Sequence, residues 1–348
     1  DGSITSGFQR TALLGMRGHF TINKNKILIE GVNLEEDSCR TIERYDDKTI
    51  FALDRQGIPL IEITTGPQIK TPQQAYDAAL YIGNVLRSFK ETKRGLGTIR
   101  QDLNVSIKGS SRVEIKGTQN LKLIPDIIAN EMRRQSVHQS ILEEVQARGI
   151  NCENFTNWET YDLTNLFKKS DSKVIKDNLK DKNSAVIAVK LFKFKDILKH
   201  EMQKGYRFAT EVSDRNKKHF PTVKGLFHSD ELPNYGITQN EVNEIRTKLE
   251  LNETDSFILI ANDKEIAIKS MQNVLEITSD LLVEVPEEVR QVDPKGTITK
   301  FLRPMPGSAR MSPETDIPEL ELKEDYLSEI KKNLPELYNK KFDRLKKD

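Results

Sequence analysis

Residues 53–68 read LDRQGIPLIEITTGPQ and contain an apolar segment, Pro-Leu-Ile-Glu-Ile, with one carboxylate at Glu62. Pro and Gly bracket this segment on both sides, which predicts a strand between two turns. Because side chains alternate across a strand, Leu60, Glu62 and Thr64 should share one face. A carboxylate in an apolar setting is costly unless it is paired or binds a cation. Glu62 is therefore expected either to form a structural ion pair with a neighbouring strand or to hold a metal ion.

A second acidic stretch lies upstream, in the sequence VNLEEDS, and contains Glu35, Glu36 and Asp37. Mg²⁺ in proteins is typically bound by one or two carboxylates together with phosphate oxygens and water. Two neighbouring strands that each carry a carboxylate could form such an oxygen site. Taken alone, the stretch is also compatible with a solvated acidic turn.

Composition limits the classes of protein that this chain can belong to. A length of 348 residues indicates two or three domains, and 36% hydrophobic with 31% charged residues is not typical of disorder. The formal net charge is +1, so any nucleic-acid surface must be local. No apolar run is long enough for a membrane span. The two cysteines fit no metal-ligand spacing, which favours a reducing, cytoplasmic location.

The chain predicts an α+β fold. Residues 1–70 indicate short strands separated by turns. A helix should begin after Thr71, because Pro72 suits the first helical position and Gln74 the third position of a capping box. A long amphipathic helix is expected over 121–148, and the polar, Lys-rich residues 160–183 resemble a boundary.

The stretch IRQDLNVSIKGSSRVEIKG predicts a β-hairpin with one apolar and one charged face. A three-residue Gly-Ser-Ser loop would place Asn104 opposite Lys116. Asp102 and Glu114 lie on the same charged face. This face is either an exposed surface of mixed charge or the lining of a cleft in which Lys116 meets phosphate. The residues themselves leave both interpretations open.

Several long motifs together resemble the B/E subunit family of tRNA-dependent amidotransferases (GatB/GatE). They occur in the family's order: SGFQRTALLG, NLEEDS, DRQGIPLIEITTGP, TPQQAY, GLGTIRQDLNVSIKGSSRVEIKG and RRQ. The block at 207–249 is similar to the insertion domain that archaeal E subunits share with bacterial-type aspartyl-tRNA synthetases and that B subunits lack. The resemblance covers nearly the whole chain and favours the archaeal E branch.

The resemblance implies a domain organisation. Residues 1–183 would form a β-rich cradle domain with flanking helices, which carries the kinase and transamidase activities. Residues 184–300 would form the inserted α/β domain of the aspartyl-tRNA-synthetase-like (GAD) type. Residues 301–348 would return to the cradle and begin a helical domain.

The resemblance also implies an activity. Such an enzyme uses ATP to phosphorylate the γ-carboxyl of mischarged Glu-tRNA(Gln), and ammonia from an asparaginase-like D subunit then displaces phosphate to give Gln-tRNA(Gln). A cytoplasmic hetero-oligomer of D and E subunits is expected. The alternative is a non-catalytic module of the same fold that binds tRNA or serves as a scaffold.

The family's Mg²⁺ lies between a histidine near the N-terminus and two glutamates, which match Glu62 and Glu36, or Glu35 in place of Glu36, in this sequence. Asp102, Asn104, Glu114 and Lys116 would line the same cradle and contact ATP. None of the five histidines matches the family's ligand. We therefore expect a fragment without the opening segment and the C-terminal tail domain, and without activity on its own.

Overall fold

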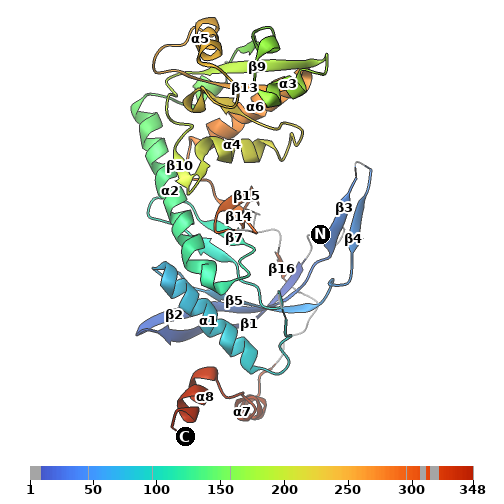
Figure 1. Ribbon diagram of the computed structural model, residues 1–348. Helices are drawn as coiled ribbons and strands as arrows, with labels where there is room; N and C mark the ends of the chain where they lie inside the picture. Colours follow the sequence, from blue (N-terminus) through green and yellow to red (C-terminus); the bar gives the residue numbers. More distant parts are fainter. Residues whose placement is uncertain are drawn as a thin grey trace. The chain divides into compact units, whose positions relative to one another are not determined.

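The computed structural model describes residues 9–45, 47–95, 97–156, 158–294, 296–305, 311–313 and 321–347. These residues form several β-sheets together with α-helices, which confirms a mixed α+β fold (Figure 1). The chain divides into two compact units, which are described separately. The first contains residues 1–100, 119–125 and 305–348, and the second contains residues 101–118 and 126–304. The predicted domain boundaries at 183 and 300 stay a prediction.

The first unit is built on a four-stranded sheet with the order β16-β1-β2-β5. Its strands are β1 (Gln9–Ile22), β2 (Asn25–Glu36), β5 (Pro59–Thr65) and β16 (Met311–Pro313). β16 pairs with β1 in parallel, and the other pairs are antiparallel. β1 and β2 have 14 and 12 residues, so the expectation of short strands is wrong for this pair. A separate hairpin consists of β3 (Arg40–Arg44) and β4 (Thr49–Ala52).

Helix α1 (Pro72–Ser88) begins where the sequence predicts. The hydroxyl of Thr71 accepts a hydrogen bond from the backbone N–H of Gln74, at 3.2 Å. The helix packs on the β1–β2 ladder, where the Tyr81 ring stacks on Phe20 with centroids 4.7 Å apart. Ile27 and Ala78 are buried in the same small cluster. α1 therefore covers one face of the sheet at the Phe20 end.

In the second unit, the predicted hairpin forms from β6 (Leu103–Val105) and β7 (Val113–Lys116). Asn104 lies opposite Glu114, so the expected pairing of Asn104 with Lys116 is wrong by two residues. The ladder ends early because the Gln135 side chain accepts a hydrogen bond from the backbone N–H of Ile107, at 3.0 Å. A two-residue shift preserves the faces, and the apolar face is buried as predicted.

This hairpin belongs to a sheet with the order β15-β14-β7-β6. β14 (Glu288–Val292) pairs with β7 in parallel, and β15 (Thr299–Pro304) pairs with β14 in an antiparallel hairpin. Strands from distant parts of the sequence therefore form one sheet.

The remaining sheet of the second unit has the order β12-β13-β9-β8. Its strands are β8 (Thr160–Asp162), β9 (Ser184–Leu191), β12 (Phe227–His228) and β13 (Ser256–Asp263). One face packs on α4 (Phe208–Asn216) and α6 (Lys264–Leu281), and the other on α3 (Lys173–Asn178) and α5 (Gln239–Lys248). Burial on both faces accounts for the continuous apolar runs of β9 and β13.

The polar residues 160–183 contribute a strand and a helix to this layer. β8 pairs with β9, and the side chains of Phe167 and Ile175 are buried. The polar composition of this stretch reflects the solvent side of a short strand and a short helix. The smaller elements of the unit are η2 (Cys152–Phe155), η3 (Leu166–Lys169), η4 (Ser229–Glu231), β10 (Glu201–Gln203) and β11 (Tyr206–Arg207).

The long helix α2 (Ile124–Ala147) follows η1 (Leu121–Leu123), in agreement with the predicted helix over 121–148. Its buried side contains charged residues among the apolar ones. Arg134 donates three hydrogen bonds of 2.7–3.0 Å to Glu131, and both side chains are fully buried.

Arg290 of β14 is the centre of the same buried ionic cluster. Its guanidinium donates two hydrogen bonds to Glu211, one to Glu288 and two to Thr299, at 2.6–2.9 Å. All five N–H donors of this arginine are therefore satisfied. Arg215 completes the cluster with bonds to Glu211 and Glu288. The cluster fastens the β14–β15 hairpin to α2 and α4.

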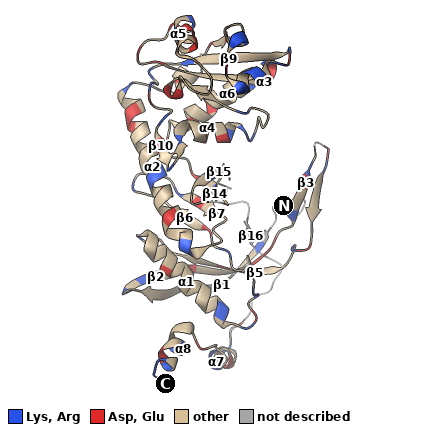
Figure 2. Cartoon of the chain, in the orientation of Figure 1, with Lys and Arg blue, Asp and Glu red and all other residues tan. Residues whose placement is uncertain are grey.

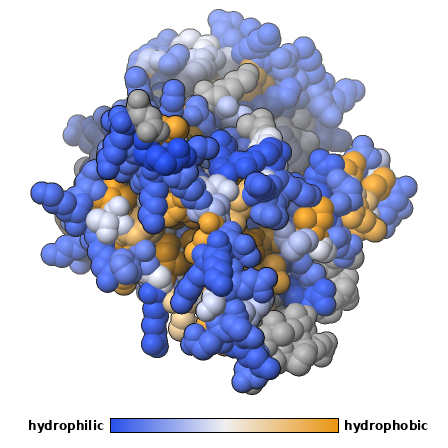
Figure 3. Space-filling model, turned by 90° about the horizontal axis from the view of Figure 1, so that it is seen from below, coloured by the Kyte–Doolittle hydropathy of each residue, from blue (hydrophilic) through white to orange (hydrophobic). Residues whose placement is uncertain are grey.

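Acidic and basic residues occur together throughout each unit, in line with the net charge of +1 (Figure 2). The first unit ends with α7 (Glu324–Lys332) and α8 (Tyr338–Leu345), whose large apolar side chains are mostly exposed. A space-filling view shows such apolar side chains among the hydrophilic ones (Figure 3). Within the described residues, no helix is long and apolar enough to cross a membrane.

Candidate functional site

Glu62 lies on the edge strand β5, and its side chain is exposed. Asn33 of β2 is directly opposite, and its side-chain amide donates a hydrogen bond of 3.3 Å to the Glu62 carboxylate. In the described part of the chain, no Lys or Arg nitrogen lies within 4.0 Å of this carboxylate. The structural ion pair, one of the two interpretations of Glu62, is therefore not found among these residues.

The strand register distinguishes the two candidate partners of Glu62. Glu35 lies opposite Leu60, and Glu36 lies opposite Pro59. Leu60 and Glu62 share a face of β5, so Glu35 shares that face while Glu36 lies on the other. Glu35 and Glu62 are thus diagonal neighbours, a relationship that places Cβ atoms roughly 7–8 Å apart or less.

Glu36 is engaged in a different contact. Arg10 of β1 donates hydrogen bonds of 3.0 and 2.9 Å from Nε and Nη2 to the two oxygens of Glu36. The side-chain hydrogen bond from Arg10 lowers the pKa of the Glu36 carboxyl, against a smaller opposing effect of burial. The acidic turn is therefore held by an arginine, and a purely solvated turn does not describe it.

Asp37, immediately after β2, also contacts arginine. The Arg55 guanidinium lies 2.6 Å from the Asp37 carboxylate, and that of Arg100 lies 3.7 Å away. The backbone of Asp37 accepts from the N–H of Gly57 and donates to the carbonyl of Ile58, at 2.9 and 2.8 Å. These bonds tie the end of β2 to the turn that precedes β5.

The oxygen donors of this surface fit a hard divalent cation. Two carboxylates, of Glu35 and Glu62, share a face with the Asn33 amide, and Mg²⁺ prefers such oxygen ligands. No group of three or more His, Cys, Asp or Glu side chains with metal-binding geometry occurs among the residues that the structure describes. Two protein carboxylates, however, are a usual complement for Mg²⁺ that also binds phosphate and water.

The second unit contains the other four predicted site residues. Lys116 Nζ lies 2.6 Å from both the Asp102 and the Glu114 carboxylates. Burial alone would lower the pKa of Lys116, but the hydrogen bonds to Asp102 and Glu114 raise it above its ordinary value. Asn104 is exposed on the same face, opposite Glu114. The structure thus brings Asp102, Glu114 and Lys116 together, and the cradle that these residues would share with Glu62 stays a prediction.

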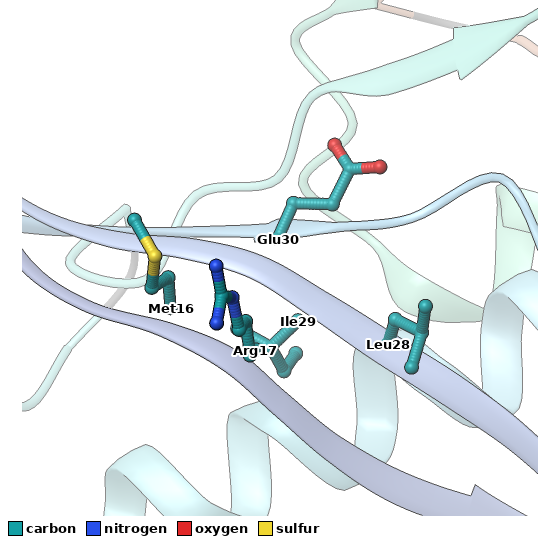
Figure 4. A pocket seen from close by; sticks show the side chains of 5 residues that line it. All are labelled: Met16, Arg17, Leu28, Ile29 and Glu30. Atoms are coloured by element: carbon teal, nitrogen blue, oxygen red, sulfur yellow. The ribbon is translucent and has the colours of Figure 1, made fainter.

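Two surface hollows lie elsewhere on the described residues. One of about 360 Å³ on the β1–β2 ladder is lined by Met16, Arg17, Leu28, Ile29 and Glu30 (Figure 4). Another, of about 330 Å³, lies on α5. Neither includes a predicted site residue, so the candidate site is defined by strand register and ion pairs.

The sequence pattern does not indicate the arginines at 10, 55 and 100 as site residues, nor the buried cluster around Arg290. Arg55 lies in the stretch LDRQGIPLIEITTGPQ at residues 53–68, but nothing in its local pattern indicates Asp37 as a partner. The α2 residues did carry a signal: Glu131, Arg134 and His138 recur at helical spacing within the apolar stripe, which predicts buried polar groups.

The family model of the GatB/GatE catalytic domain matches residues 1–328. The E subunit of the glutamyl-tRNA(Gln) amidotransferase of Thermococcus sibiricus is 48% identical over 348 residues, which are 100% of this chain and 54% of the relative. The corresponding proteins of Pyrococcus furiosus and Methanocaldococcus jannaschii are 48% and 44% identical over the same shares. The chain spans about half the length of the curated relatives that it matches. By its match to the family model over residues 1–328, the chain belongs to the GatB/GatE catalytic domain family.

Proposed function

We propose that this chain is part of a tRNA-dependent amidotransferase that converts Glu-tRNA(Gln) to Gln-tRNA(Gln). In this reaction the γ-carboxylate of the glutamyl group takes the terminal phosphoryl group of ATP and ADP leaves. Ammonia then attacks the acyl phosphate, so that inorganic phosphate leaves and the amide remains. Family membership and the names of the relatives support the proposal.

One structural observation carries it. Glu62 is an exposed carboxylate on a strand, with an amide and no cation as its partner among the described residues, and Glu35 shares its face. A stable fold gains little from such an arrangement, whereas phosphoryl transfer requires carboxylates that hold a metal ion and position phosphate.

The residues can be assigned roles within this proposal. Glu62 together with Glu35, or with Glu36, would hold Mg²⁺. The bound ion would neutralise charge on the phosphate oxygens of ATP. In the second unit, Lys116 would hold phosphate through its ammonium group, oriented by Asp102 and Glu114, and Asn104 would offer an amide on the same surface. The hydrogen bonds to Asp102 and Glu114 raise the pKa of Lys116 and so favour its cationic form despite burial.

We further propose the partners of the enzyme. An asparaginase-like D subunit would release ammonia from an amide donor, in a hetero-oligomer that acts in the cytoplasm. Residues 184–300 would be the aspartyl-tRNA-synthetase-like insertion. The second candidate function is a non-catalytic module that binds tRNA or serves as a scaffold, which would be favoured only if the full-length protein also lacked a family-matching histidine.

The test uses the full-length protein with its amidase subunit. ATP hydrolysis is followed with Mg²⁺, in the presence and absence of Glu-tRNA(Gln), for wild type and Glu62→Gln. The proposal predicts hydrolysis that depends on Glu-tRNA(Gln) and is lost in the variant at an unchanged melting temperature. A wild-type protein that binds Glu-tRNA(Gln) without hydrolysing ATP would favour the scaffold function.

A further inference from the structure

Two arginines converge on one carboxylate at the end of β2. Arg55 and Arg100 both contact Asp37, at 2.6 and 3.7 Å. In the chain as described, no other acidic side chain lies within 4.0 Å of either guanidinium. Two positive charges therefore face one negative charge, which leaves a local excess of +1.

The guanidinium groups remain accessible. The side chains of Arg55 and Arg100 are 42% and 45% exposed, whereas that of Asp37 is 12% exposed. A guanidinium has five N–H donors, and one ion pair with Asp37 leaves most of them for another acceptor. Arg10 differs, because both its Nε and its Nη2 already donate to Glu36.

The position of this pair suggests its ligand. Asp37 is two residues beyond Glu35, and its backbone is bonded to the turn that begins β5, the strand of Glu62. Arginine binds phosphate through two parallel hydrogen bonds. A surplus of guanidinium donors thus lies next to the carboxylates that are proposed to hold Mg²⁺.

We propose that Arg55 and Arg100 form a phosphate-binding site for the Mg²⁺-nucleotide, an inference that rests on the proposed function. Phosphate oxygens could also come from the tRNA backbone. The nucleotide is favoured because a metal ion on Glu35 and Glu62 would itself be bound to nucleotide phosphate. In the absence of nucleotide, the Asp37 carboxylate pairs with the two guanidinium groups, and phosphate then displaces it from them.

This assignment predicts opposite effects for the two sides of the ion pair. Arg55→Gln and Arg100→Gln each remove donors to phosphate, and should raise the KM for ATP by about tenfold or more. Asp37→Asn removes the competing acceptor, and should leave this KM unchanged or lower it. A purely structural role predicts that Asp37→Asn is at least as harmful as either arginine variant, because it weakens both contacts whereas each arginine variant removes only one.

The experiment measures Glu-tRNA(Gln)-dependent ATP hydrolysis by the full-length protein with its amidase subunit. ATP is varied at saturating tRNA, and tRNA is varied at saturating ATP. Arg44→Gln, at an exposed position on β3, is the matched control. Melting temperatures establish that each variant is folded. Arg55→Lys keeps the positive charge but loses the planar guanidinium group. Its KM for ATP should lie between those of wild type and Arg55→Gln.

The outcomes separate this inference from the proposed function. A raised KM for ATP in both arginine variants, with none in Asp37→Asn, supports the site. A rise in the KM for tRNA alone would overturn the assignment to the nucleotide, and a loss in Asp37→Asn at least as large as in the arginine variants would overturn phosphate binding. A wild-type protein without ATP hydrolysis would instead show that the proposed function fails.

Discussion

Asn33 and Glu62 face each other across strands β2 and β5, and a hydrogen bond of 3.3 Å joins the Asn33 amide to the Glu62 carboxylate. This contact is exposed and single, so it contributes little to stability. The strand register places Glu62 on the same side of the sheet as Asn33, and that side is shared with Glu35.

If Glu35 and Glu62 hold Mg²⁺ as proposed, Glu35→Gln and Glu62→Gln should each lower Mg²⁺-dependent ATP hydrolysis by about 100-fold, because each would remove a negative ligand of the ion. Glu36→Gln should reduce activity less, since its carboxylate is bonded to Arg10 on the other face. The rate of ATP hydrolysis, measured against Mg²⁺ concentration in the full-length protein, distinguishes Glu35 from Glu36 as the second metal ligand. Glu30→Gln, an exposed acid on β2, serves as the control. A larger loss in Glu36→Gln than in Glu35→Gln would make Glu36 the ligand.

Lys116→Met should lower ATP hydrolysis by about tenfold or more with little loss of stability. The variant removes the cation between Asp102 and Glu114, and partly exposed ion pairs contribute only about 0–1 kcal/mol to folding. Kinetics and urea unfolding are measured on the same preparation. Full activity in a folded Lys116→Met protein would indicate an exposed surface of mixed charge instead of a cleft lining.

Arg290→Met should lower the free energy of unfolding by about 3–5 kcal/mol, because it leaves Glu211 and Glu288 as buried charges without their main partner. Urea unfolding monitored by circular dichroism gives this value. The control is Arg133→Met, which breaks an exposed ion pair with Glu201 and should cost less than about 1 kcal/mol. Similar losses in the two variants would contradict the central role of Arg290.

Acidification should destabilise the protein through His138. Burial, followed by the charge of Arg134, lowers the pKa of His138 from 6.5 to about 4, against smaller effects of Glu211 and Glu288. The unfolded chain binds a proton below pH 6.5 and the folded chain does not until about pH 4. The contribution of His138 to the free energy of unfolding is therefore complete above pH 6.5 and decreases by about 3 kcal/mol as the pH falls to 4.

The measurement compares urea unfolding at pH 7 and pH 4.5 for wild type and His138→Gln. Glutamine can keep the hydrogen bond of 2.5 Å to the Leu281 carbonyl but does not titrate. The difference in the free energy of unfolding between pH 7 and pH 4.5 should shrink by about 2–3 kcal/mol in His138→Gln. His219→Gln, at an exposed position, should leave it unchanged. An unchanged difference in His138→Gln would show that His138 is not responsible.

Much of the local structure followed from sequence pattern. The cap at Thr71, the start of α1, the long helix α2 and the alternating faces of the β6–β7 hairpin are all confirmed, because each depends on residues close together in the chain. The hairpin register was not predictable, since it depends on Gln135, a residue of another element. The same limit applies to the candidate site. The partners of Glu36 and Asp37 lie on other strands and turns, and no local pattern identifies Arg10 or Arg100.

The parallel pairing of β7 with β14 also has a consequence for biosynthesis. Glu288 of β14 pairs with Val113 of β7, so the ribosome must add 175 more residues before β7 acquires its second neighbour. Until then, the strand that carries Lys116 presents an open edge to other chains. Translation that stops before Glu288 should therefore yield products that aggregate through β7, and the surface with Asp102 and Glu114 is among the last parts of the unit to be completed.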